Sequence, residues 1–130
     1  MLLYGHKFIP SKNFYHVLNI DAILNTPPNS TIYLKFSQEN LEIINHASIN
    51  NISFALSISN ITEAIYAASL GASYILVDRD LAKTIQEIAN NYLFDAKILV
   101  SIEDEDEIEE LALQGIDGII FSNAIIKINS

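Results

Sequence analysis

The sequence predicts an α/β domain with about six mostly parallel strands, arranged as a TIM-barrel-like partial or reduced barrel. Short apolar runs alternate along the chain with segments of helical periodicity, which is typical of parallel strands joined by right-handed crossovers. The later runs are continuously apolar, as in strands that are covered on both faces. An open doubly wound sheet, flavodoxin-like or Rossmann-like, is the alternative that this pattern leaves open.

Strand-like composition recurs at short intervals along the chain. The expected strands lie within residues 2–9, 31–37, 52–58, 73–78, 97–102 and 117–122. By the same pattern, eight strands do not fit into 130 residues. The sequence therefore predicts that one chain does not form a complete eight-fold barrel.

Helices are expected between these strands, each with one buried stripe at a period close to 3.6. They lie at 38–49, 61–70, 81–93 and 104–114, and a weaker helix is expected over 14–24, before the turn at Pro27 and Pro28.

The residues that flank these helices have the chemistry of caps. Ser37, Asn60 and Asp80 are predicted N-caps, and a glutamate follows Asn60 three residues later. Gly71 and Gly115 stand where a helix C-terminus needs a left-handed residue.

Composition and charge restrict the classes of protein to which this chain can belong. The chain of 130 residues is half hydrophobic and shows no linker, so residues 1–130 are predicted to form a single domain. A formal charge of −9 argues against a nucleic-acid partner and against anionic membranes. The chain has no cysteine, which excludes disulfides. The start, MLLYGHKF, does not read as a signal peptide, and a cytoplasmic protein is expected.

Ligands of parallel α/β sheets collect at the carboxyl ends of the strands. That rule selects His6, Lys7, Lys35, Ser57, Ser59, Asp78, Arg79, Ser101, Glu103, Ser122 and Asn123. His6 and Lys7 are the candidate catalytic pair, because a histidine transfers protons near neutral pH and a lysine holds a phosphate as a point charge.

The other candidates are ligand-binding residues. Lys35 lies in an otherwise apolar strand, so it either reaches a pocket or marks an edge strand. Arg79 follows Asp78 and is the only arginine, able to clamp a phosphate or to pair locally. Ser122 and Asn123 offer polar groups to an anion at the last expected strand.

The acidic run EDEDEIEE at 103–110 matches the dipole of a helix N-terminus. Its spacing is not that of an EF-hand, so the run offers a divalent cation only loose binding. No dedicated metal site and no cofactor are predicted. His16 and His46 lie in helix-like regions and are expected at the surface.

Residues Phe36 to Ala124 resemble the C-terminal half of the glycerophosphodiester phosphodiesterase family, a (β/α) TIM-barrel. The segments that carry the resemblance are KFSQENLEII, ASLGASYILVD, KILVSIEDEDEIEELALQ and GIDGIIFS. The last one is also similar to the "GADG" ending of phosphate-binding barrels such as thiamine-phosphate synthase. The resemblance implies a barrel architecture with phosphate-related chemistry, phosphodiester hydrolase-like or lyase-like if the protein is an enzyme.

The sequence departs from that family at its catalytic positions. His6 matches one family histidine, Lys7 stands in place of the arginine, and the Glu-x-Asp metal pair and second histidine are missing. Ser122 and Asn123 replace the terminal Thr-Asp. The catalytic set of the family is therefore incomplete in this chain.

Two functions follow as hypotheses. The first is a site for a phosphorylated or otherwise anionic small molecule at the strand ends. The second is a non-catalytic remnant of a phosphodiesterase-like barrel that acts as a protein-interaction or regulatory module. A shortened barrel leaves strand edges and apolar faces open, so a homodimer is also predicted.

Overall fold

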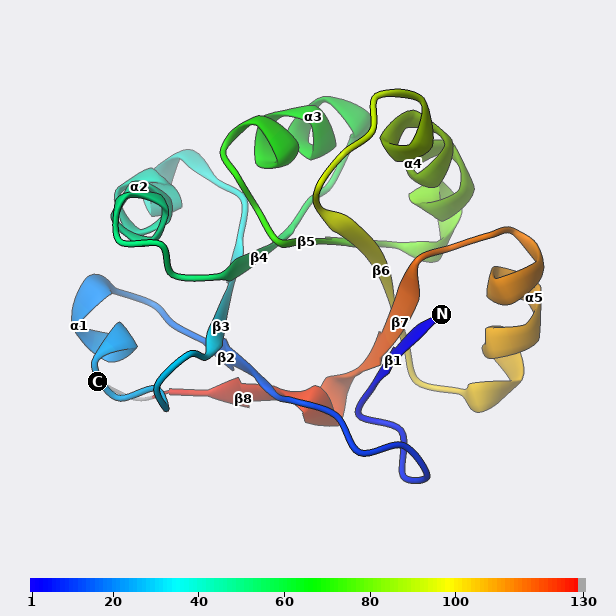
Figure 1. Ribbon diagram of the computed structural model, residues 1–130, viewed down its shortest axis with the longest axis horizontal. Coiled ribbons are helices and arrows are strands. Elements are labelled where there is room, and N and C mark those ends of the chain that lie inside the picture. The colour runs from blue at the N-terminus through cyan, green and yellow to red at the C-terminus, as the bar shows by residue number, and fades with distance from the viewer. Residues whose placement is uncertain (129–130) are drawn as a thin grey trace.

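The computed structural model describes residues 1–128, which form one sheet of eight parallel strands with helices outside it (Figure 1). The strands are β1 (Leu2–Tyr4), β2 (Phe14–His16), β3 (Thr31–Lys35), β4 (Phe54–Ser57), β5 (Tyr74–Val77), β6 (Lys97–Ile102), β7 (Gly118–Phe121) and β8 (Ile125–Lys127). Their order in the sheet is β1-β7-β6-β5-β4-β3-β2-β8.

The sheet curls into a barrel-like ring. Figure 1 shows α1 to α5 on the outside of this ring. In a doubly wound sheet the helices would cover both faces, so the barrel-like alternative is the one that the structure supports. The Asn123 side chain, just after β7, donates a hydrogen bond to the Gly5 carbonyl at 3.0 Å, which ties the carboxyl end of β1 to the turn that follows its paired neighbour β7.

The prediction of about six strands was wrong, and so was the argument that eight cannot fit. All six expected strands are present, and β2 and β8 are added to them. Eight strands fit because β1, β2 and β8 have only three residues each. In addition, neither the connection from β1 to β2 nor that from β7 to β8 contains an α-helix within the described residues.

The helices are α1 (Ile20–Ile23), α2 (Leu41–Ile49), α3 (Ile61–Ser69), α4 (Arg79–Asn91) and α5 (Ile108–Leu113). Single 3-10 turns η1 (Gln38–Asn40) and η2 (Glu105–Glu107) lead into α2 and α5, and η3 (Ser122–Ala124) links β7 to β8. Four expected helices are thus confirmed. Within residues 1–128, no helix is both long and apolar enough to cross a membrane.

The expected helix over 14–24 was wrong in its first half, because Phe14 to His16 form β2 and only Ile20 to Ile23 are helical. Phe14 is fully buried while Tyr15 and His16 are half-buried. Three residues are too few to distinguish a period of 2 from one of 3.6, and pairing with β3 and β8 decided the outcome.

Most of the predicted caps are confirmed. The Asn60 side chain accepts a hydrogen bond from the Glu63 amide at 2.8 Å, and Gly71 and Gly115 have φ of +94° and +75°. Ser37 precedes η1 without a capping hydrogen bond from its side chain. The prediction for Asp80 was wrong, because α4 begins earlier, with Asp78 as its N-cap.

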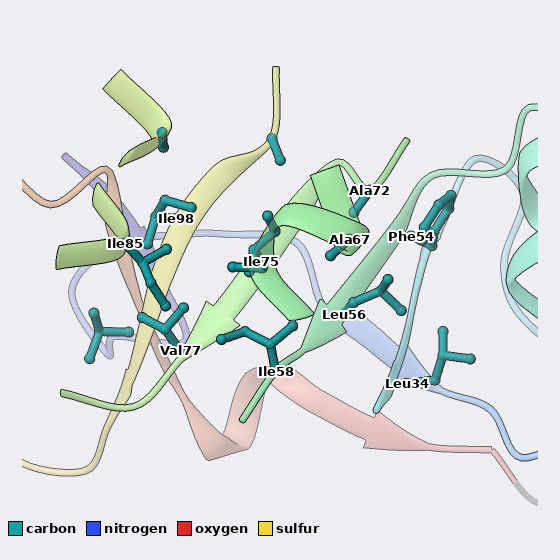
Figure 2. Packing of buried hydrophobic residues seen from close by; sticks show 14 of the residues in the cluster. Leu34, Phe54, Leu56, Ile58, Ala67, Ala72, Ile75, Val77, Ile85 and Ile98 are labelled. Atoms are coloured by element: carbon teal, nitrogen blue, oxygen red, sulfur yellow. The ribbon is translucent and has the colours of Figure 1, made fainter. Parts of the chain in front are cut away.

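Two apolar layers lie on the two faces of the sheet. The outer layer joins the strands to the helices, as Figure 2 shows for Leu56, Ile75 and Ile98 of the strands and for Ala67 and Ile85 of α3 and α4. The inner layer fills the ring and consists of Tyr4, Phe14, Ala55, Leu76, Leu99, Ile120 and Ala124, with Tyr33, Tyr74 and Ile125 packed against it.

Gly118 allows β7 to lie close to its neighbours β1 and β6. A Cβ on Gly118 would lie 2.7 Å from the Leu2 Cβ, 2.7 Å from a Leu99 methyl group and 2.8 Å from the Leu2 carbonyl oxygen. Two of these atoms belong to the β1 backbone or directly to its Cβ, so they cannot move without β1.

We expect Gly118→Ala to lower the free energy of unfolding by about 1–3 kcal/mol, because a methyl group is forced into a packed strand pair. Chemical denaturation measures it. Gly71→Ala is the comparison, since its Cβ would meet no atom within 4 Å. That variant reports only the backbone cost of a positive φ, about 1 kcal/mol. A Gly118→Ala protein as stable as wild type would contradict the close approach.

Candidate functional site

The carboxyl ends of β2, β3 and β8 bring three basic side chains to the inner face of the sheet. Side chains alternate between the two faces of a strand. Phe14, Tyr33 and Ile125 belong to or pack against the inner layer. Their neighbours two residues on, His16, Lys35 and Lys127, therefore share that inner face at the mouth of the ring.

His16 is the centre of this group. It pairs in register with Lys127 of β8 on one side and with Tyr33 of β3 on the other. Its ring stands edge-on to the Tyr33 ring, with centroids 5.2 Å apart and planes at 70°. Burial, and secondarily the nearby positive charge of Lys127, lower the pKa of His16 below its usual 6.5. The imidazole is therefore mostly neutral at pH 7.

A pocket of about 890 Å³ opens beside His16. It is lined by His16, Val17, Leu18, Lys35, Ser37, Gln38, Glu39 and Asn40. Within residues 1–128, neither Lys35 nor Lys127 forms an ion pair with a carboxylate. The Asn40 side chain donates to the Lys35 carbonyl at 2.7 Å, which joins the start of α2 to the end of β3. We call this group of His16, Lys35, Lys127 and the pocket the basic mouth.

A second pocket, of about 430 Å³, lies at the carboxyl end of β1. It is lined by Gly5, His6, Lys7, Glu103, Asp104, Glu105 and Phe121. Its lining shares no residue with the basic mouth pocket. The structure therefore does not bring His6 and Lys7 together with Lys35. Three carboxylates against one lysine and one histidine make this pocket a poor place for an anion.

Both ring nitrogens of His6 are already engaged. The Phe8 amide donates to Nδ1 at 3.1 Å, so Nδ1 carries no proton in this arrangement. Nε2 lies 2.9 Å from a Glu105 carboxylate oxygen and donates to it. A histidine held from both sides has no free nitrogen for a substrate proton, and here it ties the loop after β1 to η2. The Lys7 ammonium lies 5.2 Å from the Phe8 ring centroid.

Two of the remaining predicted site residues, Arg79 and Asn123, make side-chain contacts within the scaffold. Arg79 donates to Glu107 at 2.6 Å and also to Glu110, so it pairs with the acidic run on the outside of the ring. Asp78 is the N-cap residue of α4. Asn123 donates to the Gly5 carbonyl, and Ser122 is an exposed residue at the start of η3.

Sequence reasoning missed two of the three residues of the basic mouth. His16 was assigned to a helix-like region, and Lys127 lay beyond the last expected strand. The sequence signal for these two residues was weak. In FYH (14–16) and in IIK (125–127), an apolar residue and a basic residue stand two positions apart. Only pairing between β2 and β8 brings these two segments side by side.

A polar chain crosses the opposite end of the strands. Lys12 donates to the Thr31 hydroxyl at 3.1 Å, Thr31 donates to Ser53 at 2.9 Å, and Ser53 donates to Ser73 at 2.9 Å. The chain satisfies the Thr31 hydroxyl, whose residue is only 1 % exposed. We interpret it as a structural network, because its members form hydrogen bonds with one another.

The Tyr4 and Tyr74 hydroxyls lie 3.1 Å apart inside the ring. Burial and the Tyr74 contact raise the pKa of Tyr4 well above its usual 10. Burial alone would raise the pKa of Tyr74 as well, but hydrogen bonds from Lys12 and Tyr4 outweigh it and lower that pKa. The Lys12 ammonium lies 4.8 Å from the Tyr74 ring centroid, so its positive charge is close to the Tyr74 side chain.

Within the described part of the chain, no three histidine, aspartate or glutamate side chains are grouped so that they could hold a metal ion. No protein-family model matches the chain, and no curated protein matches it. The resemblance to phosphodiesterase-like barrels therefore stays a prediction.

We expect Lys127→Gln to raise the pKa of His16, because the substitution removes one of the two causes that lower it. Titration of the imidazole resonances by NMR measures the change. Lys83→Gln is the control, since Lys83 lies on α4 and is no cause of the shift. An unchanged His16 titration in Lys127→Gln would contradict the contact.

The direction of the His16 shift also sets a pH dependence. The unfolded chain binds a proton at His16 more readily than the folded chain, because the folded pKa lies below 6.5. This contribution to stability is therefore complete above about pH 6.5 and is lost as the pH falls through the folded pKa. Denaturation midpoints of wild type and His16→Gln are compared at pH 7.5 and pH 5, on either side of the usual histidine pKa of about 6.5. Wild type should lose more stability between these two values than His16→Gln.

We expect neutral His6 to be the Nε2-protonated tautomer, since Nδ1 accepts the Phe8 amide. Long-range proton–nitrogen NMR correlations distinguish the tautomers. His46 is the internal reference, because its ring makes one longer contact, 3.4 Å from Nδ1 to the Asn50 amide nitrogen. An Nδ1-protonated His6 would show that the ring is not held between Phe8 and Glu105.

Proposed function

We propose that the protein binds a small anionic molecule, phosphorylated or carboxylated, in the basic mouth at the carboxyl ends of β2, β3 and β8. The observation that carries the proposal is the pair of lysines, Lys35 and Lys127, that flank a half-buried histidine without carboxylate partners in residues 1–128. The chain as a whole has a formal charge of −9. Lys35 and His16 line the pocket, and Lys127 lies beside His16 on the next strand. Lysines without carboxylate partners at this place in so acidic a chain favour an anionic ligand over a neutral one.

The geometry suits a ligand with one charged group and a polar body. Neighbouring strands are about 4.8 Å apart, and Lys35 lies two residues beyond the level of Lys127, so their backbones are roughly 12 Å from each other. Two long flexible side chains can close that span on one phosphate or carboxylate. Glu39 and Asn40 line the same pocket and offer an acceptor and an amide to hydroxyl groups of the ligand.

The protonation of His16 should make the affinity for the ligand depend on pH. An anion beside the imidazole stabilises its protonated form, so ligand binding should raise the pKa that burial and Lys127 lower. By linkage, the same anion binds more tightly as the pH falls through the His16 pKa. The proposal is for binding and assigns no catalytic step, because no group within the pocket is placed as a nucleophile beside a base.

The test is a thermal-shift series with inorganic phosphate, glycerol 3-phosphate and citrate on wild type, Lys35→Gln/Lys127→Gln and the control Lys83→Gln. A ligand at 100 times its dissociation constant adds about 2.7 kcal/mol of stability, or several degrees. We expect that shift in wild type and in Lys83→Gln, and its loss in the double variant.

Two results would contradict the proposal. One is a shift of equal size in all three proteins, which indicates non-specific ion effects. The other is a shift that survives in Lys35→Gln/Lys127→Gln but disappears in Lys7→Gln, which would move the anion site to the pocket beside His6.

A further inference from the structure

A row of polar side chains continues from the basic mouth along the inner face of the sheet. Three strands, β4, β5 and β6, each contribute one residue to the inner layer, namely Ala55, Leu76 and Leu99. Because side chains alternate between the two faces of a strand, the residues two positions later share that face at the carboxyl ends. They are Ser57, Asp78 and Ser101, which we call the polar row. Asp78 keeps the alternation, since it follows β5 directly with extended backbone angles, φ −75° and ψ 154°.

The polar row begins directly beside a lysine of the basic mouth. Lys35 pairs in register with Ser57, and the Phe36 amide donates to the Ser57 carbonyl at 2.9 Å, so β3 and β4 stay paired to their ends. The pairing of β5 with β6 runs to the residues just before Asp78 and Ser101, which sets these two side by side. Strands β3 to β6 follow one another around one side of the ring (Figure 1). The path from Lys35 to Ser101 therefore crosses three strand spacings, roughly 14 Å along the sheet.

The side chains of the polar row have no partner within residues 1–128. The Ser57 and Ser101 hydroxyls and the Asp78 carboxylate form no hydrogen bond and no ion pair there. Asp78 and Ser101 are exposed, and Ser57 is half-buried. At the opposite ends of β4 and β5, the Ser53 hydroxyl donates to Ser73 at 2.9 Å. The serines at the amino ends thus satisfy each other, whereas those at the carboxyl ends are available to a ligand.

The order of charges and hydroxyls along this path defines what a ligand must carry. Lys35 attracts an anionic group to one end of the row. The Asp78 carboxylate repels that group, and it only accepts hydrogen bonds, whereas each serine hydroxyl both donates and accepts. A ligand that satisfies the row therefore presents hydrogen-bond donors to Asp78 and groups that donate and accept to its neighbours. Hydroxyl groups on successive carbons have both properties.

We propose that the ligand of the basic mouth is a polyhydroxylated anion, whose charged group binds Lys35 and Lys127 and whose hydroxyl groups bind the polar row. The inference rests on the anion site proposed above and specifies its ligand. A sugar acid and a phosphorylated polyol share this chemistry. An anion without hydroxyl groups would leave the Asp78 carboxylate without a donor.

The test compares ligands that differ in their hydroxyl groups, namely gluconate with hexanoate and glucitol 6-phosphate with hexyl phosphate. Isothermal titration calorimetry gives both dissociation constants of each pair, and their ratio is the preference for hydroxyl groups. The ratio cancels a general change in the attraction of anions. We expect wild type to prefer the hydroxylated member by about 10-fold or more, the effect of a hydrogen bond to a charged group. The pair that binds more tightly identifies the charged group as carboxylate or phosphate.

Ser57→Ala and Asp78→Ala should each reduce this preference by about 3-fold or more, because each removes a partner of the ligand hydroxyls. Neither change removes a hydrogen bond of the fold within residues 1–128. Ser69→Ala and Asp80→Ala are the matched controls, since both residues are exposed on helices, α3 and α4, outside the ring. Both controls should keep the preference of wild type.

Equal affinities within each pair overturn the inference and leave the basic mouth as a site for a simple anion. Binding by no member of either pair overturns the proposed anion site and this inference together. A preference that Ser57→Ala and Asp78→Ala leave unchanged moves the hydroxyl groups to Glu39 and Asn40, away from the polar row, and also overturns it. Tighter binding of 6-aminohexanoate than of gluconate would assign Asp78 to an ammonium group, with the same consequence.

Discussion

Contact between three aromatic rings across the inside of the sheet is the constraint on which the rest of the structure depends. Tyr4, Phe14 and Tyr74 come from β1, β2 and β5, and their ring centroids lie 5.0 to 5.8 Å apart. Strands that are far apart in the sheet order can bring side chains this close only if the sheet curls. Edge-to-face packing of the rings stabilises that curl beyond the burial of their area.

The curl determines where chemistry can occur. Because the inner face is filled by side chains along most of the strands, polar groups remain at the two ends of the ring. At the amino ends, Thr31, Ser53 and Ser73 satisfy one another and Lys12. At the carboxyl ends, Lys35 and Lys127 have no carboxylate partner among residues 1–128. This difference, rather than position alone, distinguishes a structural network from a candidate binding site.

The two strand connections without an α-helix leave part of the ring uncovered. Neither the connection from β1 to β2 nor that from β7 to β8 contains an α-helix within residues 1–128, and Ile126 of β8 is 38 % exposed, whereas Ile75 and Ile119 are fully buried. Residues 1–20 and 118–128 contain no aspartate or glutamate.

The sequence by itself determined the class of fold, six of the eight strands, four helices and most of their caps. These depend on local signals, namely apolar periodicity, Asn60 as an N-cap and glycines at positive φ, and such signals act within a few residues of each other. It also selected Lys35 correctly as a residue at the carboxyl end of a strand. Tertiary structure decided the number of strands and the membership of the basic mouth. The residues of β2 and β8 are too few to form a periodic pattern, and His16 meets Lys127 only through a pairing between segments more than a hundred residues apart in the chain.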